Sequence, residues 1–398
     1  MTAVRLAVVG AGGIAQAVHL PLLQRNRDRA EISALVDLSA HRRDVVGQRY
    51  GIPERSRFAC VADLVDAVRS GSLPLDAALL ATSGLHCADA ALLLGCGLSV
   101  LSEKPLAYSA RELDELEREA GRQGIDLAQR LRVGYMKEYD PAVAAARQHL
   151  SGSRVRAVTI EVLHPADDRQ LDFARLLASE TDIAADELRR LTQLLDTETR
   201  ATAGDVPDDL RRIFASVLLG SVVHDIALLR HLGLPLENVT SASRSGGGFP
   251  GSITASGTTA DGMVPWQLGW HFIPEYPEYR ETITVHHETG TMTLVFPTPY
   301  LLNAPTRLVV DSVAHPLGHA VTETTWPQSE AFERELHALL AMSAGVPDPG
   351  SSVAEARADL RVAEQFLRVL SASTENTAHH DELSGTRSDG TSPKGRHH

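Results

Sequence analysis

The chain is poor in cysteine, in aromatic residues and in positive charge, and each shortage excludes a class of protein. Three of its 398 residues are cysteine and 5% are aromatic. Because Cys60, Cys87 and Cys96 form no even set and have no metal-ligand spacing, we expect reduced thiols rather than disulfides. The formal net charge of −13 opposes binding to nucleic acid and to anionic membrane surfaces.

Long hydrophobic runs are also missing. No apolar run approaches the roughly 20 residues that a helix needs to cross a bilayer. The first apolar segment starts almost at the N-terminus, without the charged leader and cleavage site of a signal peptide. We therefore expect a soluble, cytoplasmic protein with no membrane partner. A chain of this length is also expected to form two domains.

The first third of the chain alternates short apolar runs, which predict strands, with amphipathic segments, which predict helices. Strands are expected at residues 4–9, 32–36, 77–81, 99–101 and 131–135, and helices at 14–25, with a bend at Pro21, at 86–95 and at 110–123. Because strands alternate with helices, the pattern predicts an α/β, doubly wound parallel sheet of the Rossmann type. We assign this domain to residues 1–128.

A glycine-rich turn follows the first predicted strand and opens the first helix. It reads Gly10-Ala11-Gly12-Gly13-Ile14-Ala15. Gly10 permits the tight turn, Gly12 has no side chain to block a pyrophosphate, and Ala15 lets the helix pack closely on the strand. We expect this turn to bind a dinucleotide.

An acidic residue follows at the distance that dinucleotide-binding folds use. Asp37 lies about 20 residues beyond the turn, at the end of a strand, where its carboxylate can accept hydrogen bonds from the adenosine ribose. Its charge favours NAD by repelling a ribose 2′-phosphate, but Arg42 and Arg43 lie close enough in sequence to neutralise one. NAD is the expected cofactor, and NADP stays open.

A second motif, Glu103-Lys104-Pro105, ends another hydrophobic run. Doubly wound sheets bind ligands at the carboxyl ends of their strands, and a residue before proline is held extended or in a turn there. The Lys104 ammonium can then hydrogen-bond a reacting oxygen and stabilise alkoxide character as hydride leaves or arrives. The alternative is a surface lysine paired with Glu103.

Together these motifs resemble the Gfo/Idh/MocA family, the group of glucose-fructose oxidoreductase and inositol 2-dehydrogenase. The resemblance covers residues 1–372 and rests on the glycine turn, Asp37, Ala81-Thr82-Ser83-Gly84-Leu85-His86, Glu103-Lys104-Pro105 and Gly134-Tyr135-Met136-Lys137-Glu138-Tyr139-Asp140-Pro141. We take as cofactor-binding candidates Gly10, Gly12, Gly13, Ile14, Ala15, Asp37, Arg42, Thr82, His86, Glu103 and Lys104.

The resemblance also implies a C-terminal α+β domain, at residues 129–372, whose open, mostly antiparallel sheet joins copies of the chain into a dimer or tetramer. It implies hydride transfer between a nicotinamide and a hydroxyl or keto carbon of a sugar-like or cyclitol substrate. From the residues alone, strands are expected at 239–245, 252–259, 264–272, 280–287, 291–296 and 306–310. Helices are expected at 328–343 and 353–370, before a disordered tail at 373–398.

Apolar positions at helical spacing predict one long helix over residues 207–232. Family members commonly carry an aspartate one turn before a histidine in this helix, and the histidine exchanges the substrate proton. Here the histidine is His224, and Gly220 stands in the place of the aspartate. Its absence removes an orienting partner for His224, and Asp225 points about 100° away around the helix.

His224 is therefore the catalytic candidate for the proton, with Lys137 and Tyr135 in reserve, and a satisfied core histidine is the alternative. No convincing metal-ligand cluster is present, since His286 and His287 point to opposite faces of a strand.

Residues 165–206 have the composition of an insertion, with leucines at helical spacing that predict one or two amphipathic helices. A lid over the substrate cleft and a structural elaboration or oligomer contact are both open. Three functions are carried forward: a NAD(P)-dependent oxidoreductase, an enzyme that cleaves glycosidic bonds by oxidation and elimination on tightly held NAD, and a non-catalytic nucleotide-binding accessory protein.

Overall fold

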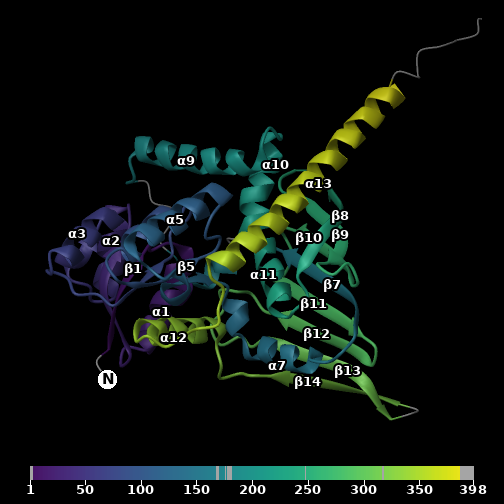
Figure 1. The fold of residues 1–398 in the computed structure, drawn as a ribbon, viewed down its shortest axis with the longest axis horizontal. Helices are drawn as coiled ribbons and strands as arrows, with labels where there is room; N and C mark the ends of the chain where they lie inside the picture. Colours follow the sequence, from purple (N-terminus) through teal and green to yellow (C-terminus); the bar gives the residue numbers. More distant parts are fainter. Residues whose placement is uncertain are drawn as a thin grey trace, which may run out of the picture.

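The computed structural model describes residues 3–166, 170–174, 176, 182–246, 248–315 and 318–385. They form two sheets that lie side by side, each with helices packed against it (Figure 1). The expectation of an α/β protein with a Rossmann sheet followed by a mostly antiparallel sheet is confirmed.

The first sheet has six parallel strands in the order β3-β2-β1-β4-β5-β6. Its strands are β1 (Val4–Val9), β2 (Ala30–Val36), β3 (Arg57–Phe58), β4 (Ala77–Leu80), β5 (Ser99–Glu103) and β6 (Leu131–Gly134). Its helices are η1 (Ala15–His19), α1 (Leu20–Arg25), α2 (Ala40–Arg49), η2 (Glu54–Ser56), α3 (Val61–Arg69), α4 (Cys87–Leu94), α5 (Ala110–Gln123) and α6 (Leu127–Arg130). Because β6 pairs with β5, the first sheet continues past residue 128.

Helices cover both faces of this sheet, and its central strands are buried except for the first two residues of β1. Leu6, Ala7, Val8 and Val9 of β1 are fully buried, which is why the strand reads as an unbroken apolar run. The strand order reverses between β1 and β4, and the crevice beyond their carboxyl ends is where such sheets bind ligands.

The second sheet has eight strands in the order β14-β13-β12-β11-β7-β10-β9-β8. Its strands are β7 (Val155–His164), β8 (Leu236–Ser245), β9 (Ser252–Thr259), β10 (Pro265–Phe272), β11 (Arg280–His287), β12 (Gly290–Phe296), β13 (Arg307–His315) and β14 (Gly318–Thr325). All neighbouring pairs are antiparallel except β7 with β10.

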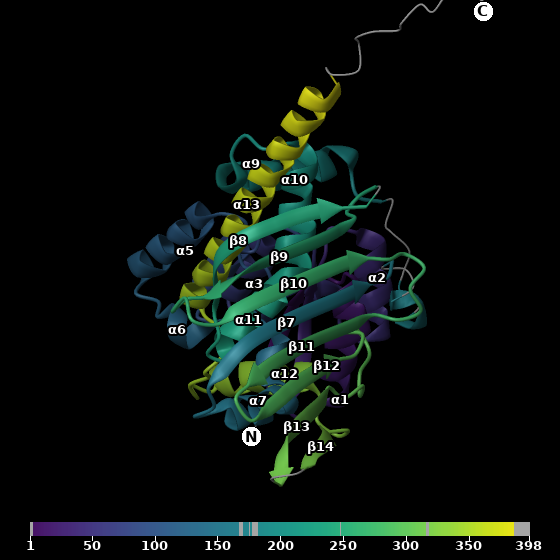
Figure 2. The ribbon, with the colours of Figure 1, turned by 90° about the vertical axis from the view of Figure 1, so that its right-hand side faces the viewer.

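Side chains alternate between a buried and an exposed face along this sheet. On β7, for example, Val158, Ile160 and Val162 are each 1% exposed, and the residues between them face outward. The helical tract that follows the insertion and the last helix cover the inner face. Figure 2 views the opposite face, over which no helix of the described chain lies.

That helical tract runs without a break through α10 (Asp208–Ile213), the π-helical η5 (Phe214–Val222) and α11 (Val223–His231), as the sequence predicts. The helical tract Asp208–His231 is long and apolar enough to cross a membrane, by length and composition alone. The expectation that no apolar segment reaches this length is therefore wrong. The apolar window of this tract is 67% buried inside the protein, which is typical of a core helix.

The remaining helices link the two sheets. They are η3 (Met136–Tyr139), α7 (Pro141–Leu150), η4 (Asp172–Ala174), α9 (Ala185–Ala203), α12 (Ala331–Ser343) and α13 (Val353–Gly385). α12 packs beside α1, β4 and β5, so a C-terminal segment covers the Rossmann domain. α13 lies on β8 and α11 and projects from the body (Figure 1).

Two of our expectations for the C-terminal half are corrected by the structure. α13 does not end near residue 370 but continues to Gly385, through a segment whose alanines and glutamates favour helix. Only residues 386–398 of the predicted disordered tail lie outside the described residues. The strands β7 and β14 were also missed: β7 has a clear alternating pattern, whereas every residue of β14 is exposed and gives no such signal.

The insertion forms a helix, as predicted, but α9 does not cover the substrate side. α9 packs against α13 and α10, and its Glu198 accepts a hydrogen bond from Ser109 at the start of α5, at 2.6 Å. Leu188, Leu191 and Leu194 of α9 are exposed. The segment before α9 contacts the cavity described below, and residues 167–169, 175 and 177–181 of the expected lid lie outside the described residues.

Candidate active site

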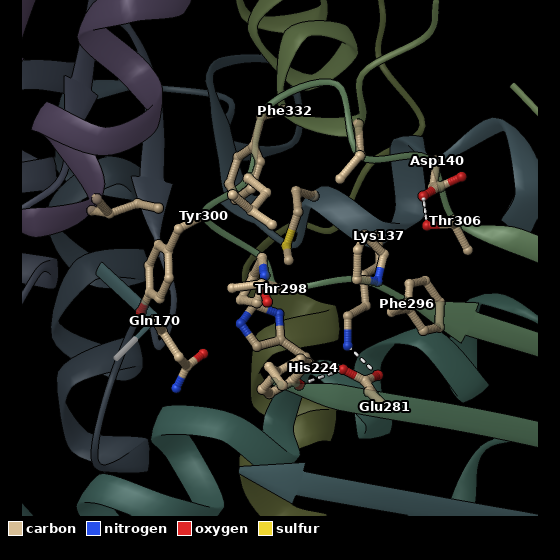
Figure 3. Close-up of a pocket in the computed structure, with 18 of the residues that line it drawn as sticks. Lys137, Asp140, Gln170, His224, Glu281, Phe296, Thr298, Tyr300, Thr306 and Phe332 are labelled. Atoms are coloured by element: carbon tan, nitrogen blue, oxygen red, sulfur yellow. Dashed lines mark hydrogen bonds and ion pairs between the residues drawn. The ribbon is translucent and has the colours of Figure 1, made fainter. Parts of the chain in front are cut away.

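A cavity of about 310 Å³ lies where the carboxyl end of the first sheet meets the C-terminal domain (Figure 3). Its walls come from the glycine turn, η3, η5, α11, β11 and the loops around residues 296–306 and 329–332. Six of the predicted site residues line it, namely Ile14, Thr82, Glu103, Lys104, Lys137 and His224.

The first two glycines of the turn have different surroundings. Gly10 has φ of +92°, and a Cβ there would lie 2.7 Å from backbone atoms of Ala81 and Thr82. A Cβ on Gly12 would meet no atom within 4 Å. The turn therefore needs glycine at position 10 for its shape, while position 12 offers open space that a pyrophosphate can enter.

Residues 170, 171 and 176 of the insertion also lie close to the glycine turn and the cavity. A Cβ on Gly13 would lie 3.5 Å from the Leu176 side chain and 3.9 Å from that of Leu171. Gln170 lines the cavity. Ala15 is fully buried and packs η1 on the sheet, so it supports the turn without facing the cavity.

The carboxylate of Asp37 closes the turn. It accepts hydrogen bonds from the backbone nitrogens of Ala11 and Ser39, both at 2.9 Å. The nearest guanidinium nitrogen of Arg42 lies 3.5 Å away, so Arg42 faces Asp37. Asp37 thus sits between the glycine turn and α2, where an adenosine ribose is expected.

A second acidic residue, which no sequence pattern indicates, lies at the start of α2. Asp182, from the insertion, accepts a hydrogen bond from the backbone nitrogen of His41 at 3.0 Å. This bond, together with one from the side chain of Ser39, lowers the pKa of Asp182. Arg43 donates to the backbone oxygens of Asp37 and Leu38, so it also belongs to this corner.

The loop after β4 contributes one cavity residue and one support. Thr82 lines the cavity, and its buried hydroxyl has no hydrogen-bond partner among the described residues. His86, which we expected at the cofactor, is 1% exposed and does not line the cavity. Its two ring nitrogens lie 2.8 Å from the backbone oxygens of Pro105 and Thr82, so its position corrects that expectation: it braces the two loops.

Glu103 and Lys104 end β5 and both line the cavity. Glu103 lies 2.7 Å from the ring of His19. Burial acts to raise the pKa of Glu103, but His19 and Lys104 outweigh it and lower the pKa. The ammonium of Lys104 donates to the backbone oxygen of Gly220 across the cavity, so it is not a surface lysine paired only with its neighbour.

His224 faces the cavity from α11. Its Nδ1 is buried without a partner among the described residues, and burial, then Lys104 and Lys137, lower its pKa well below the usual value. His224 is therefore a neutral imidazole. A Cβ on Gly220 would meet only the backbone oxygen of Ala215, at 3.6 Å, so the absence of the expected aspartate leaves room beside the histidine.

Lys137 belongs to a buried cluster of polar side chains that no sequence pattern predicts. Lys137 forms an ion pair with Glu281 of β11, and Figure 3 shows the two side chains pointing toward one another. The hydroxyl of Tyr279 donates to Glu281 at 2.6 Å, and Asp225 of α11 contacts the same carboxyl group. The ammonium of Lys137 also lies 4.7 Å from the ring centre of Phe296.

Tyr135, the other reserve candidate, is 2% exposed and does not line the cavity. Its hydroxyl hydrogen-bonds Asp359, and its ring packs edge-on against His224, with 6.3 Å between ring centres. Burial raises its pKa well above the usual value. The structure thus places Tyr135 behind the histidine, where it contributes packing.

Among the residues that the structure describes, no three His, Cys, Asp or Glu side chains are arranged to hold a metal ion. His286 and His287 lie on opposite faces of β11, and His287 lies 3.4 Å from His149.

Comparison with known proteins agrees with this geometry. Residues 4–129 match the family model GFO_IDH_MocA, described as an oxidoreductase family with an NAD-binding Rossmann fold. A protein of Amycolatopsis mediterranei (strain S699), named as a UDP-kanosamine synthase oxidoreductase subunit, is 31% identical over 160 residues. That match spans 39% of this chain and 42% of the relative.

Two solved structures share the whole fold. UDP-N-acetylglucosamine 3-dehydrogenase of Acidithiobacillus ferrooxidans has a TM-score of 0.64 at 19% identity, over 94% of this chain and 99% of that one. Aldose-aldose oxidoreductase of Caulobacter crescentus has a TM-score of 0.67 at 16% identity, over 92% and 97% of the two chains. The N-terminal domain of the chain therefore matches the Gfo/Idh/MocA oxidoreductase family, and the chain as a whole shares its fold with these two structures.

Proposed function

We propose that the chain is an NAD-dependent oxidoreductase that transfers a hydride between the nicotinamide ring and a hydroxyl or keto carbon of a sugar-like or cyclitol substrate. The observation that carries the proposal is that Lys104, at the end of β5, lines the same cavity as Ile14, the residue of the glycine turn that reaches it from the end of β1. A dinucleotide held by the turn has its reactive end near an ammonium group there.

The residues present fit such a cofactor. The open space at Gly12 accepts the pyrophosphate, Asp37 is placed for the adenosine ribose, and the unpartnered hydroxyl of Thr82 offers a hydrogen bond at the cavity wall. When bound, NAD supplies or accepts the hydride. The protein must then hold the substrate oxygen and exchange a proton with it.

Lys104 holds that oxygen. Its ammonium donates to a backbone oxygen across the cavity, and a substrate hydroxyl or carbonyl can take the same kind of bond. Because a positive donor stabilises an oxygen that gains negative character, Lys104 favours the transition state over the ground state. His224 and Lys137, which line the same cavity, are the candidates for proton exchange.

NAD is the favoured cofactor over NADP. Asp37 and Asp182 place two carboxylates beside the start of α2, the corner in which a ribose 2′-phosphate would have to bind. Arg42 and Arg43 lie in the same corner, but Arg42 faces Asp37 and Arg43 donates to backbone oxygens. The negative charges of Asp37 and Asp182 repel the 2′-phosphate of NADP in this corner.

Calorimetric titration with NAD and NADP, followed by NADH formation on myo-inositol, scyllo-inositol, glucose and UDP-glucose, tests the proposal. We expect binding of NAD and turnover of at least one sugar or cyclitol that depends on Lys104. If neither dinucleotide binds, the proposal fails. If NAD binds and no compound is turned over, in wild type and Lys104→Ala alike, the accessory-protein alternative replaces it.

One observation favours a second function, in which NAD stays bound while a glycosidic group is eliminated. Gln170, Leu171 and Leu176 of the insertion lie against the cavity and the glycine turn, a position that slows the release of a dinucleotide. Fluorescence of the filtrate after turnover separates the two functions. Free NADH in the filtrate supports the dehydrogenase, and product without free NADH supports the elimination.

The cellular setting follows the same reasoning. We infer a cytoplasmic protein, supported by three free cysteines, and a dimer or tetramer that pairs through the outer face of the second sheet. That face is free of helices in the described chain (Figure 2). Light scattering of wild type and of Thr254→Arg, a change on that face, measures the assembly. A monomer in both contradicts the inferred assembly.

A further inference from the structure

Three buried side chains from distant parts of the chain meet beside the cavity. Lys137 comes from η3, Asp225 from α11 and Glu281 from β11. Their exposed fractions are 6%, 1% and 1%. Burying three ionisable groups is costly unless they neutralise one another, so their meeting needs a reason.

The partners of Glu281 leave one proton to be shared with Asp225. One Glu281 oxygen pairs with the Lys137 ammonium, and the other accepts from Tyr279 at 2.6 Å. Asp225 hydrogen-bonds Glu281, and one of its own oxygens has no partner among the described residues. Two carboxyl groups in hydrogen-bond contact favour sharing one proton, because two adjacent carboxylates repel one another.

The electrostatics assign that proton to Asp225. Burial, and then the charge of Glu281, raise the pKa of Asp225 well above its usual value. Burial also acts to raise the pKa of Glu281, but Lys137 and the hydrogen bonds to it overcome burial and lower the pKa. The arrangement that these contacts favour is therefore an ion pair between Lys137 and the Glu281 carboxylate, with the shared proton on Asp225.

His224 is a poor alternative for holding a proton at this wall. No carboxylate supports its Nδ1 among the described residues, and both Lys104 and Lys137 oppose a positive charge on the ring. The carboxyl group missing at Gly220 is thus not replaced next to His224. One carboxyl group of the cavity wall, that of Glu281, pairs with Lys137 instead.

We propose that Lys137 exchanges the proton of the reaction with the substrate oxygen and that Asp225, through Glu281, is the positioning residue that stores and restores this proton. The inference rests on the proposed oxidoreductase function. In carbonyl reduction, the carbon gains a hydride, and the Lys137 ammonium gives its proton to the oxygen. The neutral amine of Lys137 then takes the proton of Asp225 by way of Glu281.

Charge balances across this step. The substrate gains one hydride and one proton, and the cluster loses one proton, ending as one ammonium with two carboxylates. Uptake of a proton from water restores it. Because the loaded form carries a proton on Asp225, it can donate a proton and suits reduction of a keto carbon. Alcohol oxidation runs the same transfer backwards and needs the unloaded form.

Other titratable groups also face the cluster. They are Lys104, Asp140, His164, His224, Tyr279 and Tyr300. Asp140 caps α7 and accepts from Thr306 at 2.6 Å, and its pKa is raised chiefly by burial. Asp140 is the one carboxyl group among these six, and it contacts Thr306 rather than Glu281. The proton that Asp225 holds therefore depends on the contact between Asp225 and Glu281.

Asp225→Asn is the sharpest variant, because asparagine keeps the shape and can still donate to Glu281 but cannot release a proton. Infrared spectroscopy at neutral pH reads the stored proton directly and needs neither cofactor nor activity. We expect the wild-type minus variant difference to show the C=O band of a protonated carboxyl group. Absence of this band overturns the proposal.

The pH dependence of carbonyl reduction tests the exchange itself. In wild type the rate falls as pH rises through the apparent pKa of the pair, and we expect this fall to shift or vanish in Asp225→Asn. Lys137→Met is expected to lose about 100-fold in rate while retaining NADH binding. Glu335→Gln is the matched control, since Glu335 is another buried carboxyl group whose pKa burial raises well above its usual value.

A wild-type pH profile in Asp225→Asn overturns the proposal even if the band is present, because the proton is then stored but not used. A shifted profile in Glu335→Gln overturns it as well, since the effect would then belong to buried carboxyl groups in general. Failure of the wild-type chain to bind NADH contradicts the proposed function instead, and the infrared result stands apart from it.

Discussion

The two ends of the cavity are built in different ways. At the cofactor end, the glycine turn, Asp37 and Lys104 follow β1, β2 and β5, which lie within three positions of one another in one parallel sheet. At the far end, Lys137 and Glu281 are separated by 144 residues and meet only because η3 packs against the second sheet. The first end depends on local order along the chain, and the second on tertiary packing.

This difference explains where the expected chemistry is kept and where it is altered. A strand followed by a glycine turn fixes the position of a phosphate wherever it occurs. A proton-exchanging group needs only a carboxyl partner of suitable pKa, and any element that reaches the cavity can supply one. Loss of the aspartate at Gly220 is therefore compatible with catalysis, because β11 and α11 bring carboxyl groups to Lys137.

The largest effect that separates the two ends is expected from Lys104→Ala. Removal of one charged donor to the reacting oxygen should lower kcat by about 100- to 1,000-fold. Because the side chain donates across the cavity and does not form the turn, NAD binding should persist. Steady-state NADH formation and calorimetry measure the two quantities. Loss of both together would place Lys104 in cofactor binding alone.

The two glycines of the turn offer a matched pair. In Gly10→Ala, the added Cβ meets Ala81 and Thr82 at 2.7 Å at a φ of +92°, so the variant should lose about 1–3 kcal/mol of stability. In Gly12→Ala, nothing lies within 4 Å of the added Cβ, so the melting temperature should stay and NAD binding should weaken. Equal melting temperatures in the two variants would contradict this reading of the turn.

Stability should depend on pH in opposite ways at Asp76, which lies just before β4 on the edge of the first sheet away from the cavity, and at Asp225, beside the second end of the cavity. Asp76, which pairs with Arg5 of β1 at 2.7 Å, has a lowered pKa, chiefly through this hydrogen bond. Its contribution is complete above the unfolded pKa of about 3.9 and is lost as pH falls through the folded pKa. The pair is partly exposed, so Asp76→Asn should cost less than about 1 kcal/mol at neutral pH.

Asp225 has a raised folded pKa, so the native state takes up a proton that the unfolded chain releases. Its effect on stability becomes less favourable as pH rises above about 3.9 toward the folded pKa. Asp225→Asn should therefore gain stability over wild type more at pH 8 than at pH 5, as thermal melts at both pH values would show. An equal gain at both would mean that Asp225 is ionised.

The smallest expected effect concerns the choice of cofactor. Asp182→Asn keeps an acceptor for the backbone nitrogen of His41 and removes one negative charge. Because such a charge at a helix start contributes about 0.3–1 kcal/mol, NADP affinity should rise roughly two- to fivefold while NAD affinity changes little. Asp186→Asn, an exposed change on α9, is the control. No change in the ratio would remove Asp182 from cofactor selection.

The sequence predicts the first end of the cavity well. Gly10, Gly12 and Asp37 lie where the spacing places them, and Lys104 faces the cavity as the end of a buried strand requires. The errors there concern side chains whose direction depends on neighbours. His86 turns toward Pro105 and Thr82, because the loops on either side offer backbone oxygens that no sequence pattern shows.

At the second end the sequence predicts elements better than contacts. The 207–232 helix and His224 at the cavity are correct, but the partners of Lys137 lie on strands that only the folded sheet aligns. On the helix, Asp225 points away from the face of His224, and that direction brings it to Glu281. α13 ends at residue 385 rather than at the predicted residue 370, because the polar residues beyond residue 370 still favour helix.

The central claim is that a dinucleotide bound at the glycine turn delivers its nicotinamide to the cavity in which Lys104 lies. The most direct measurement is a crystal structure of the chain with NAD and a substrate from the panel above. We expect the substrate oxygen within about 3 Å of the Lys104 ammonium, with the nicotinamide beside it. A nicotinamide outside this cavity, or Lys104 turned away from the substrate, would contradict it.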